Sequence, residues 1–204
     1  MLRIDNLSKR YGDHFVFQGL THAFQPGCVA LCEEDGTGKS SLLGIIAGAI
    51  APDEGEAWID GHSLIRTPKQ AKARMAYVPD DCLLFPMLTG RGLLEQAALE
   101  KNAELGDAAF GLADELGLEP HLDKRFEQMS TGTRRKFFLA AAAIGAPAVV
   151  IADGPSNGLD ASARAVLAER FKAWSRDRVV LFASHDAELL RACGARAIRV
   201  AALR

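Results

Sequence analysis

The chain has 204 residues, of which 49% are hydrophobic, and this length suits one domain or one domain carrying an inserted lobe. Its 24 basic and 26 acidic residues give a formal net charge of -2, which argues against a nucleic-acid partner held by bulk charge. No apolar run reaches the roughly 18 residues that span a bilayer, and the N-terminal residues lack the apolar stretch of a secretory signal. The four cysteines form no Cys-x-x-Cys pair, so neither a zinc site nor a disulfide framework is predicted. We therefore expect a reduced, cytosolic globular protein.

The N-terminal part of the chain alternates short β-like runs with turns. Its candidate elements are strands at 1–7, 15–24, 28–32, 56–59 and 75–78, and a helix at 41–48. Pro26-Gly27 and Pro52–Gly55 separate these runs, and Asp60-Gly61 indicates a hairpin turn. A loop at 33–40 joins the third strand to the helix.

From about residue 80 to residue 146 the pattern becomes helical, rich in alanine and leucine, without a convincing strand. Two near-continuous apolar runs follow at 148–152 and 179–183, which is typical of parallel strands buried on both faces. A helix at 161–174 supplies the crossover between them. We expect a single α/β domain over 1–204, with a core at about 1–79 and 147–204 and a helical subdomain at about 80–146.

The loop before the first helix carries Gly36-Thr-Gly-Lys-Ser40 between a strand and a helix start. Backbone N–H groups and a helix N-terminus in this context cradle phosphates, while the lysine neutralises charge and the hydroxyl holds Mg²⁺. A second signal supports this prediction. Asp153 ends the apolar run Val149-Val-Ile-Ala, where a carboxylate that steadies Mg²⁺ is expected.

These motifs, in this order, resemble those of the ATP-binding-cassette (ABC) ATPases, and the resemblance covers almost the whole chain. The matching motifs are Tyr11 in Ser8–Gly12, the phosphate loop Gly36–Ser41, the Q-loop segment Tyr77–Asp80, the signature segment Met129–Thr133, the acid and D-loop Asp153–Asp160, and the switch segment Ser184–Asp186. The resemblance implies a P-loop NTPase core with a mixed or parallel sheet, an N-terminal antiparallel β subdomain and an inserted helical subdomain.

The resemblance also implies roles for individual residues. The expected ATP-binding residues are Tyr11, which would stack on adenine, and Asp35, Gly36, Thr37, Gly38, Lys39, Ser40 and Ser41. The expected Mg²⁺ ligands are Ser40, Asp80 and Asp153, and the retained signature residues are Ser130 and Gly132. The catalytic positions are the switch histidine His185, the D-loop Asp160, and Gly154, which stands where the family has its catalytic glutamate.

The phosphate loop departs from the family pattern at its first position, where Glu33 replaces glycine and is followed by Glu34 and Asp35. A carboxylate about 4 Å from a phosphate costs up to about 4 kcal/mol at an effective dielectric near 20, before screening. Carboxylates that point outward cost far less, and the sequence leaves their direction open. We expect ATP and Mg²⁺ to bind with reduced affinity.

Three further departures concern hydrolysis. Asp80 replaces the Q-loop glutamine but can still ligate Mg²⁺ through oxygen. The signature has Thr131 and Thr133 in place of glycine and glutamine. Gly154 has no side chain, and a positioned base is typically worth 10²–10⁴-fold in rate, so hydrolysis is expected to be weak or absent.

Three hypotheses remain open. The chain is an ATP-binding subunit with impaired catalysis, an active ATPase subunit of an exporter, or a scaffold that binds no nucleotide. The resemblance implies a second ABC subunit, in a homodimer or heterodimer, and a transmembrane transporter subunit. The run Leu83–Leu88 is a candidate docking segment for that subunit, with lobe core as the alternative. A cytoplasmic location, peripheral on the inner face of the membrane, is expected.

Overall fold

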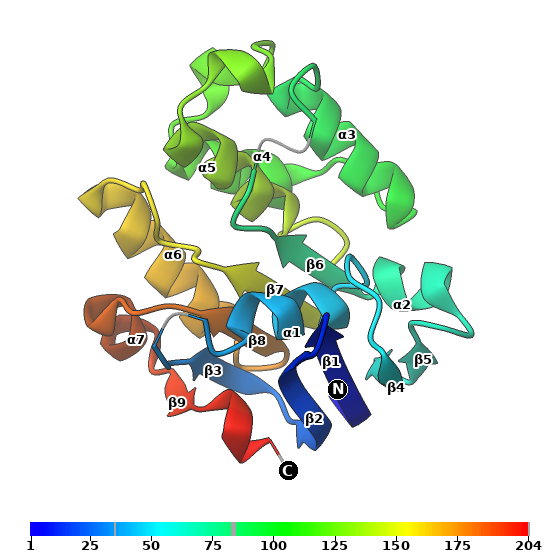
Figure 1. Cartoon of the computed structure of the whole chain (residues 1–204). Helices are drawn as coiled ribbons and strands as arrows, with labels where there is room; N and C mark the ends of the chain where they lie inside the picture. Colours follow the sequence, from blue (N-terminus) through cyan, green and yellow to red (C-terminus); the bar gives the residue numbers. More distant parts are fainter. Residues whose placement is uncertain (35, 83–84, 204) are drawn as a thin grey trace.

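A computed structural model describes residues 1–34, 36–82 and 85–203, and the strands form two sheets (Figure 1). The first sheet is antiparallel, in the order β2-β1-β4-β5, and the second has five parallel strands in the order β6-β7-β8-β3-β9. The strands are β1 Leu2–Tyr11, β2 His14–Phe24, β3 Gly27–Leu31, β4 Glu54–Ile59, β5 His62–Ser63, β6 Met75–Val78, β7 Val149–Asp153, β8 Val179–Ala183 and β9 Arg196–Ile198.

The helices lie around these sheets. They are α1 Lys39–Ile46, α2 Pro68–Ala73, α3 Gly90–Glu100, α4 Asp107–Glu115, α5 Thr131–Ala141, α6 Ala161–Trp174 and α7 Ala187–Cys193, with short 3-10 turns at Glu119–His121, Phe126–Gln128 and Val200–Ala202. None of the helices within the described ranges is long and apolar enough to cross a membrane.

Strands β7 and β8 of the parallel sheet are apolar apart from Asp153 at the end of β7, because both faces are covered. Every residue of β7 and β8 is buried, and their cores are valine, isoleucine, leucine and phenylalanine. Helix α6 connects these two strands as the predicted crossover. Since parallel strands all end at the same edge, the segments that follow β3, β6, β7 and β8 meet there.

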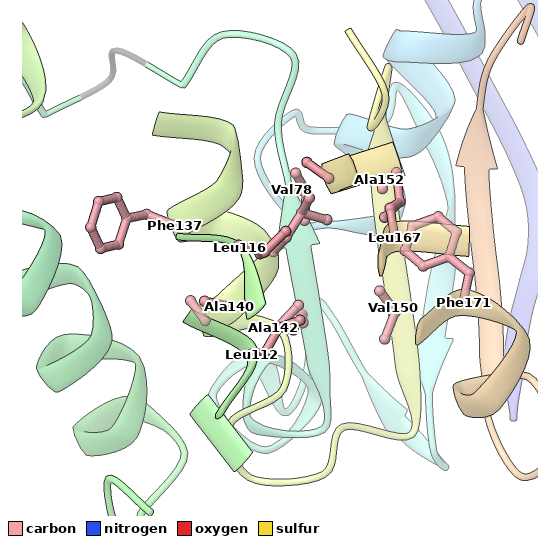
Figure 2. Close-up of a cluster of buried hydrophobic side chains, with 14 of the residues drawn as sticks. Val78, Leu112, Leu116, Phe137, Ala140, Ala142, Val150, Ala152, Leu167 and Phe171 are labelled. Carbon is pink, nitrogen blue, oxygen red and sulfur yellow. The ribbon is translucent and has the colours of Figure 1, made fainter. Parts of the chain in front are cut away.

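Helices α3, α4 and α5 follow β6 in the chain and gather at one end of the molecule, away from β1 and β2 (Figure 1). Leu112, Leu116 and Phe137 of this group belong to one buried cluster with Val78 and Phe171 of the sheet and α6 (Figure 2). The cluster is continuous across the helical group and the sheet, so the two parts share a core. Among the described residues of this stretch, the β pairing is limited to an isolated bridge between Thr89 and Arg125.

The predicted α/β architecture is confirmed, and each strand and helix predicted from apolar runs is present. The hairpin at Asp60-Gly61 is also present, with positive φ at both residues, as such a turn requires. The elements α2, α7 and β9 and the 3-10 turn Val200–Ala202 were missed, and β1 continues to Tyr11 rather than ending near Leu7. The four cysteines are free thiols.

Candidate functional site

The phosphate loop joins β3 to α1 and is shaped by left-handed glycines. Gly36 and Gly38 have φ of 82° and 91°, and Gly38 precedes the first helical residue, Lys39. The Lys39 side chain is 8% exposed, and its Nζ donates hydrogen bonds to the carbonyl oxygens of Glu33 at 2.6 Å and Glu34 at 2.7 Å. The ammonium is therefore held inside the loop that is predicted to receive phosphates.

The carboxylate of Glu33 points toward the C-terminal segment, a direction that the sequence left open. Its Oε2 accepts a hydrogen bond from the backbone N–H of Val200 at 2.9 Å, at the start of the last 3-10 turn. The side chain thus ties the beginning of the phosphate loop to the C-terminal segment. Thr37 bonds within the loop, because its hydroxyl donates to the Glu34 carbonyl at 3.0 Å.

Ser40 and Asp153 are two of the three residues that are predicted to hold Mg²⁺, and Asp80 is the third. Asp153 ends β7, is 7% exposed, and accepts a side-chain hydrogen bond from Ser40. Burial raises the pKa of Asp153, with a smaller contribution from the nearby charge of Asp80, while the Ser40 bond opposes the rise. A buried carboxylate next to a hydroxyl suits Mg²⁺, which takes one or two protein oxygens together with phosphate oxygens and water. Within the described residues, no group of three or more His, Cys, Asp or Glu forms an all-protein metal cage.

Tyr11 lies beside the loop at the end of β1. Its hydroxyl is 3.5 Å from Ser41 Oγ, its ring is 5.1 Å from Lys9 Nζ, and 53% of the residue is exposed. A cavity of about 340 Å³ separates Tyr11 and His14 from the loop and the start of α1. An exposed ring on the wall of this cavity is suitable for stacking on a base, the role predicted for Tyr11.

Asp80 follows β6 and is bound by a buried arginine. Arg135 of α5 is 1% exposed, and its Nη2 donates to the carbonyl oxygen of Asp80 at 2.6 Å and to its Oδ1 at 3.0 Å. The Nη1 of Arg135 donates to the carbonyl oxygen of Asn157 at 2.7 Å. Arg135 therefore joins α5 to the segments that follow β6 and β7.

Gly154 follows Asp153 in a left-handed conformation, with φ of 55°. A Cβ added here would overlap the side-chain amide of Asn157 and would lie 3.1 Å from Asp80 Oδ1. Only glycine adopts this backbone without strain. The resemblance to the family places a catalytic glutamate at position 154, and the backbone conformation there favours glycine.

The retained signature residues begin α5. Ser130 is the N-cap, and its Oγ accepts a hydrogen bond from the Thr133 N–H at 3.1 Å. A Cβ on Gly132 would overlap the carbonyl oxygen of Gly158, so α5 approaches the loop after β7 very closely. The signature and D-loop segments of the same chain are therefore in direct contact.

The two remaining predicted catalytic residues lie near this edge of the sheet. Asp160 caps α6 by accepting from the Ala163 N–H at 2.8 Å, and it pairs with Lys136 Nζ at 2.8 Å. That pairing lowers the pKa of Asp160. His185 is exposed and directly follows β8 and Ser184.

The shared strand edge brings the phosphate loop, Asp80, Asp153, Gly154 and His185 to one side of the sheet. Asp35, Leu83 and Leu84 lie outside the described residues, so the predictions on them remain predictions. Sequence reasoning missed Arg135. A signal was present, because Arg135 precedes the buried Leu139 by four residues and so shares the inner face of α5.

Comparisons with known proteins identify the family. A model of the family described as ABC transporter matches residues 18–157. The chain belongs to the ABC transporter family. The ABC transporter ATP-binding protein YxdL of Bacillus subtilis is 31% identical over 200 residues, which cover 91% of this chain and 78% of that protein.

Other members of the ABC transporter family are larger than the matched segment. Nod factor export ATP-binding protein I of Cupriavidus metallidurans is 30% identical over 193 residues, covering 92% of this chain and 64% of that protein. The phospholipid-transporting ATPase ABCA7 of Homo sapiens is 36% identical over 181 residues. The match covers 86% of this chain but only 8% of ABCA7, so the chain spans a small part of that relative.

Solved structures agree with the family. The structure of an ATP-binding subunit of an ABC transporter superposes with a TM-score of 0.84 at 27% identity, covering 98% of this chain and 86% of that one. A dimeric ATP-binding cassette bound to ADP and Pi shares the fold, with a TM-score of 0.81 at 21% identity over 94% of this chain and 91% of the other. The fold is that of an ABC ATPase, with an antiparallel N-terminal sheet, a parallel core sheet and a helical insertion.

Proposed function

We propose that this chain is the ATP-binding subunit of an ABC transporter, and that it binds ATP with Mg²⁺ but hydrolyses it slowly. The observation that carries the proposal is the phosphate loop, where the buried Lys39 at the start of α1 donates to the carbonyl oxygens of Glu33 and Glu34 and follows the left-handed Gly38. When ATP binds, its phosphate oxygens would replace those carbonyl contacts. Ser40, Asp80 and Asp153 would hold Mg²⁺, which supplies charge neutralisation to the phosphates when bound.

Slow hydrolysis follows from Gly154. A general base is worth 10²–10⁴-fold in rate, and the left-handed backbone at this position presents no side chain to a water. We propose that the altered signature, with Thr131 and Thr133, adds to the loss by weakening closure over the partner's nucleotide. An active exporter ATPase is the second candidate, and the export protein among the relatives favours it.

A thermal unfolding series with ATP and Mg²⁺ tests nucleotide binding. A ligand at 100 times its Kd stabilises the folded state by about 2.7 kcal/mol, so a rising Tm with ATP concentration is expected. Lys39→Ala should abolish the rise, while Lys69→Ala, an exposed lysine of α2, should keep it. No rise in the wild type would favour the third hypothesis, a scaffold without nucleotide.

We also propose two protein partners, a second ABC subunit and a transmembrane transporter subunit, with this chain on the cytoplasmic face of the membrane. Two exposed apolar side chains before α3, Phe85 at 55% and Met87 at 59%, support a docking face for the membrane subunit. They line a hollow with Pro86, Leu88 and Gln96. Residues 80–146 would then act as one helical subdomain that carries this face.

Membrane recruitment tests this surface. Phe85→Asp combined with Met87→Asp should release the chain from membranes that contain the transporter. Leu99→Asp is the matched control, because Leu99 is 81% exposed on α3 but is not among the residues that line the hollow. Equal release by both changes would contradict the proposed docking face.

A further inference from the structure

The ring of Tyr11 is held at two points. Its hydroxyl lies 3.5 Å from Ser41 Oγ in the first turn of α1, and the Nζ of Lys9 lies over the ring at 5.1 Å from its centre. A cation over an aromatic face is attracted to the electrons of the ring, so this contact favours one orientation of the side chain. Tyr11 nevertheless stays 53% exposed. A ring that is open to solvent at the end of β1 therefore has a preferred orientation.

Lys9 is itself fixed by the segment between α1 and β4. Its Nζ donates to the carbonyl oxygen of Ala51 at 3.0 Å and pairs with Asp53 Oδ2 at 3.4 Å. The same carboxylate oxygen accepts a hydrogen bond from the backbone N–H of Arg10 at 2.8 Å. Only 13% of the Lys9 side chain is exposed, whereas a surface lysine usually keeps its ammonium in water. The ammonium is thus placed by protein groups rather than by solvent.

The cavity beside Tyr11 is reached by the ring but not by the lysine. Its described lining consists of Tyr11, His14 and Val16 together with residues of the phosphate loop and the start of α1. Lys9 does not belong to that described lining, so it contacts the ring from a side other than the cavity side. A base that stacks on Tyr11 in the cavity would therefore meet the ring and not the lysine. Lys9 can act on such a base only through Tyr11.

We propose that Lys9 is a positioning residue for the nucleotide base, which holds the Tyr11 ring ready for stacking, an inference that rests on the proposed binding of ATP at this site. The Ala51 carbonyl and Asp53 are the anchors that keep the ammonium in place. A side chain that is ordered before the ligand arrives loses less conformational freedom on binding, and this raises the affinity. Stacking needs the flat face of a base, so the benefit belongs to the base and not to the phosphates.

Calorimetric titration of the purified full chain with ATP and with inorganic tripolyphosphate, both with Mg²⁺, tests this assignment. Both ligands carry three linked phosphates, but tripolyphosphate has no base. Lys9→Met keeps the length of the side chain and removes the ammonium. It should weaken ATP binding about threefold or more and leave the affinity for tripolyphosphate within about twofold. Lys69→Met, at an exposed lysine of α2, should leave both affinities unchanged. Equal weakening of both ligands by Lys9→Met would show that the lysine acts through its charge on the phosphates and would overturn the proposal.

A double-mutant cycle tests whether Lys9 acts through Tyr11. Tyr11→Leu removes the aromatic ring and should itself weaken ATP binding, because the stacking surface is lost. In the Tyr11→Leu background, Lys9→Met should change the affinity for ATP by less than about twofold, since no ring remains to be positioned. The same loss of affinity with and without the ring would overturn the proposal. This cycle uses ATP alone, so it decides the question even where tripolyphosphate binds too weakly to measure.

Lys9 also ties β1 to the segment before β4, so its replacement affects stability, which urea unfolding of each variant measures. Lys9→Arg keeps a cation that can lie over the ring and pair with Asp53, and it should bind ATP within about twofold of the wild type. Asp53→Asn serves if Lys9→Met does not fold. It weakens the anchoring of the ammonium but keeps an oxygen acceptor for the Arg10 N–H, and it should weaken ATP binding while sparing tripolyphosphate.

The outcomes separate the inference from the proposed function. Failure of the wild type to bind ATP would refute the proposed function. ATP binding that Lys9→Met leaves unchanged would overturn the role of Lys9 alone. ATP binding that Tyr11→Leu leaves unchanged would overturn both the stacking predicted for Tyr11 and the role of Lys9, while binding through the phosphate loop would stand.

Discussion

Glu33 and Val200, which are 167 positions apart, are joined by a hydrogen bond of 2.9 Å from the Val200 N–H to the Glu33 carboxylate. The 3-10 turn that begins at Val200 is itself anchored to β2, because the Leu203 carbonyl accepts from the Thr21 N–H at 3.1 Å. The first residue of the phosphate loop thus has a structural partner. The Glu33 side chain fastens the phosphate loop to the C-terminal segment.

Replacement of Glu33 should therefore affect stability more than ATP affinity. Glu33→Gly removes the acceptor of the Val200 N–H and should cost about 0.5–1.5 kcal/mol in the free energy of unfolding. ATP affinity should stay within threefold, since the carboxylate is held by Val200. Urea unfolding and ATP titration measure the two effects, with Glu33→Gln, which keeps an acceptor, as the control. ATP binding ten times tighter in Glu33→Gly would show that the carboxylate repels the phosphates.

Alanine substitutions at two helical glycines, Gly132 and Gly111, should change the stability of the fold in opposite directions. Gly132 is in close contact with Gly158, whereas Gly111 has open space around it. Gly132→Ala forces a Cβ against the Gly158 carbonyl and should destabilise the fold by about 1–3 kcal/mol. Gly111→Ala in α4 meets nothing within 4 Å and should stabilise it by about 0.5–1 kcal/mol. Thermal unfolding of both variants checks this pair. A stable Gly132→Ala would mean that α5 does not approach the loop after β7 so closely.

The free energy of unfolding should depend on pH because of Lys101. Burial lowers the pKa of Lys101 from 10.5 to about 8, and its Nζ donates to the Ile144 carbonyl at 2.9 Å. Between these two pKa values the unfolded chain binds more protons, so the contribution of Lys101 to stability rises with pH from about 8 to 10.5. The full rise is up to about 3 kcal/mol.

Urea unfolding at pH 7.5 and at pH 9.5 measures this effect as the difference between wild type and Lys101→Met. The wild type should gain stability relative to Lys101→Met as the pH is raised. Lys69→Met, at an exposed site of α2, should follow the wild type at both pH values. Parallel curves for wild type and Lys101→Met would show that Lys101 is not desolvated.

The sequence predicts the core strands because their burial leaves a strong local signal. Strand β8 is apolar throughout, and β7 is apolar up to Asp153 at its end. Strand β9 has only three residues, carries Arg196, and is partly exposed, so no such run marks it. Its pairing with β3 depends on the folded sheet rather than on its own sequence.

The same distinction holds for the site. Lys39, Ser40 and Asp153 are predictable because each stands at a fixed place relative to a strand end. The contacts of Asp80 with Arg135 join residues 55 positions apart, and no local pattern in the sequence specifies which partner the aspartate takes. The left-handed backbone of Gly154 is likewise set by the contacts of the loop after β7.

The fate of bound ATP tests the central claim most directly. The purified chain is loaded with ATP and Mg²⁺, separated from free nucleotide, and its bound nucleotide is followed over time. Many enzymes turn over at about 10 s⁻¹, so a site without its glutamate is expected to retain ATP for seconds to minutes, and Lys39→Ala should retain none. Conversion of the bound ATP to ADP and phosphate within a fraction of a second would contradict slow hydrolysis, and failure of the wild type to retain any nucleotide would contradict ATP binding.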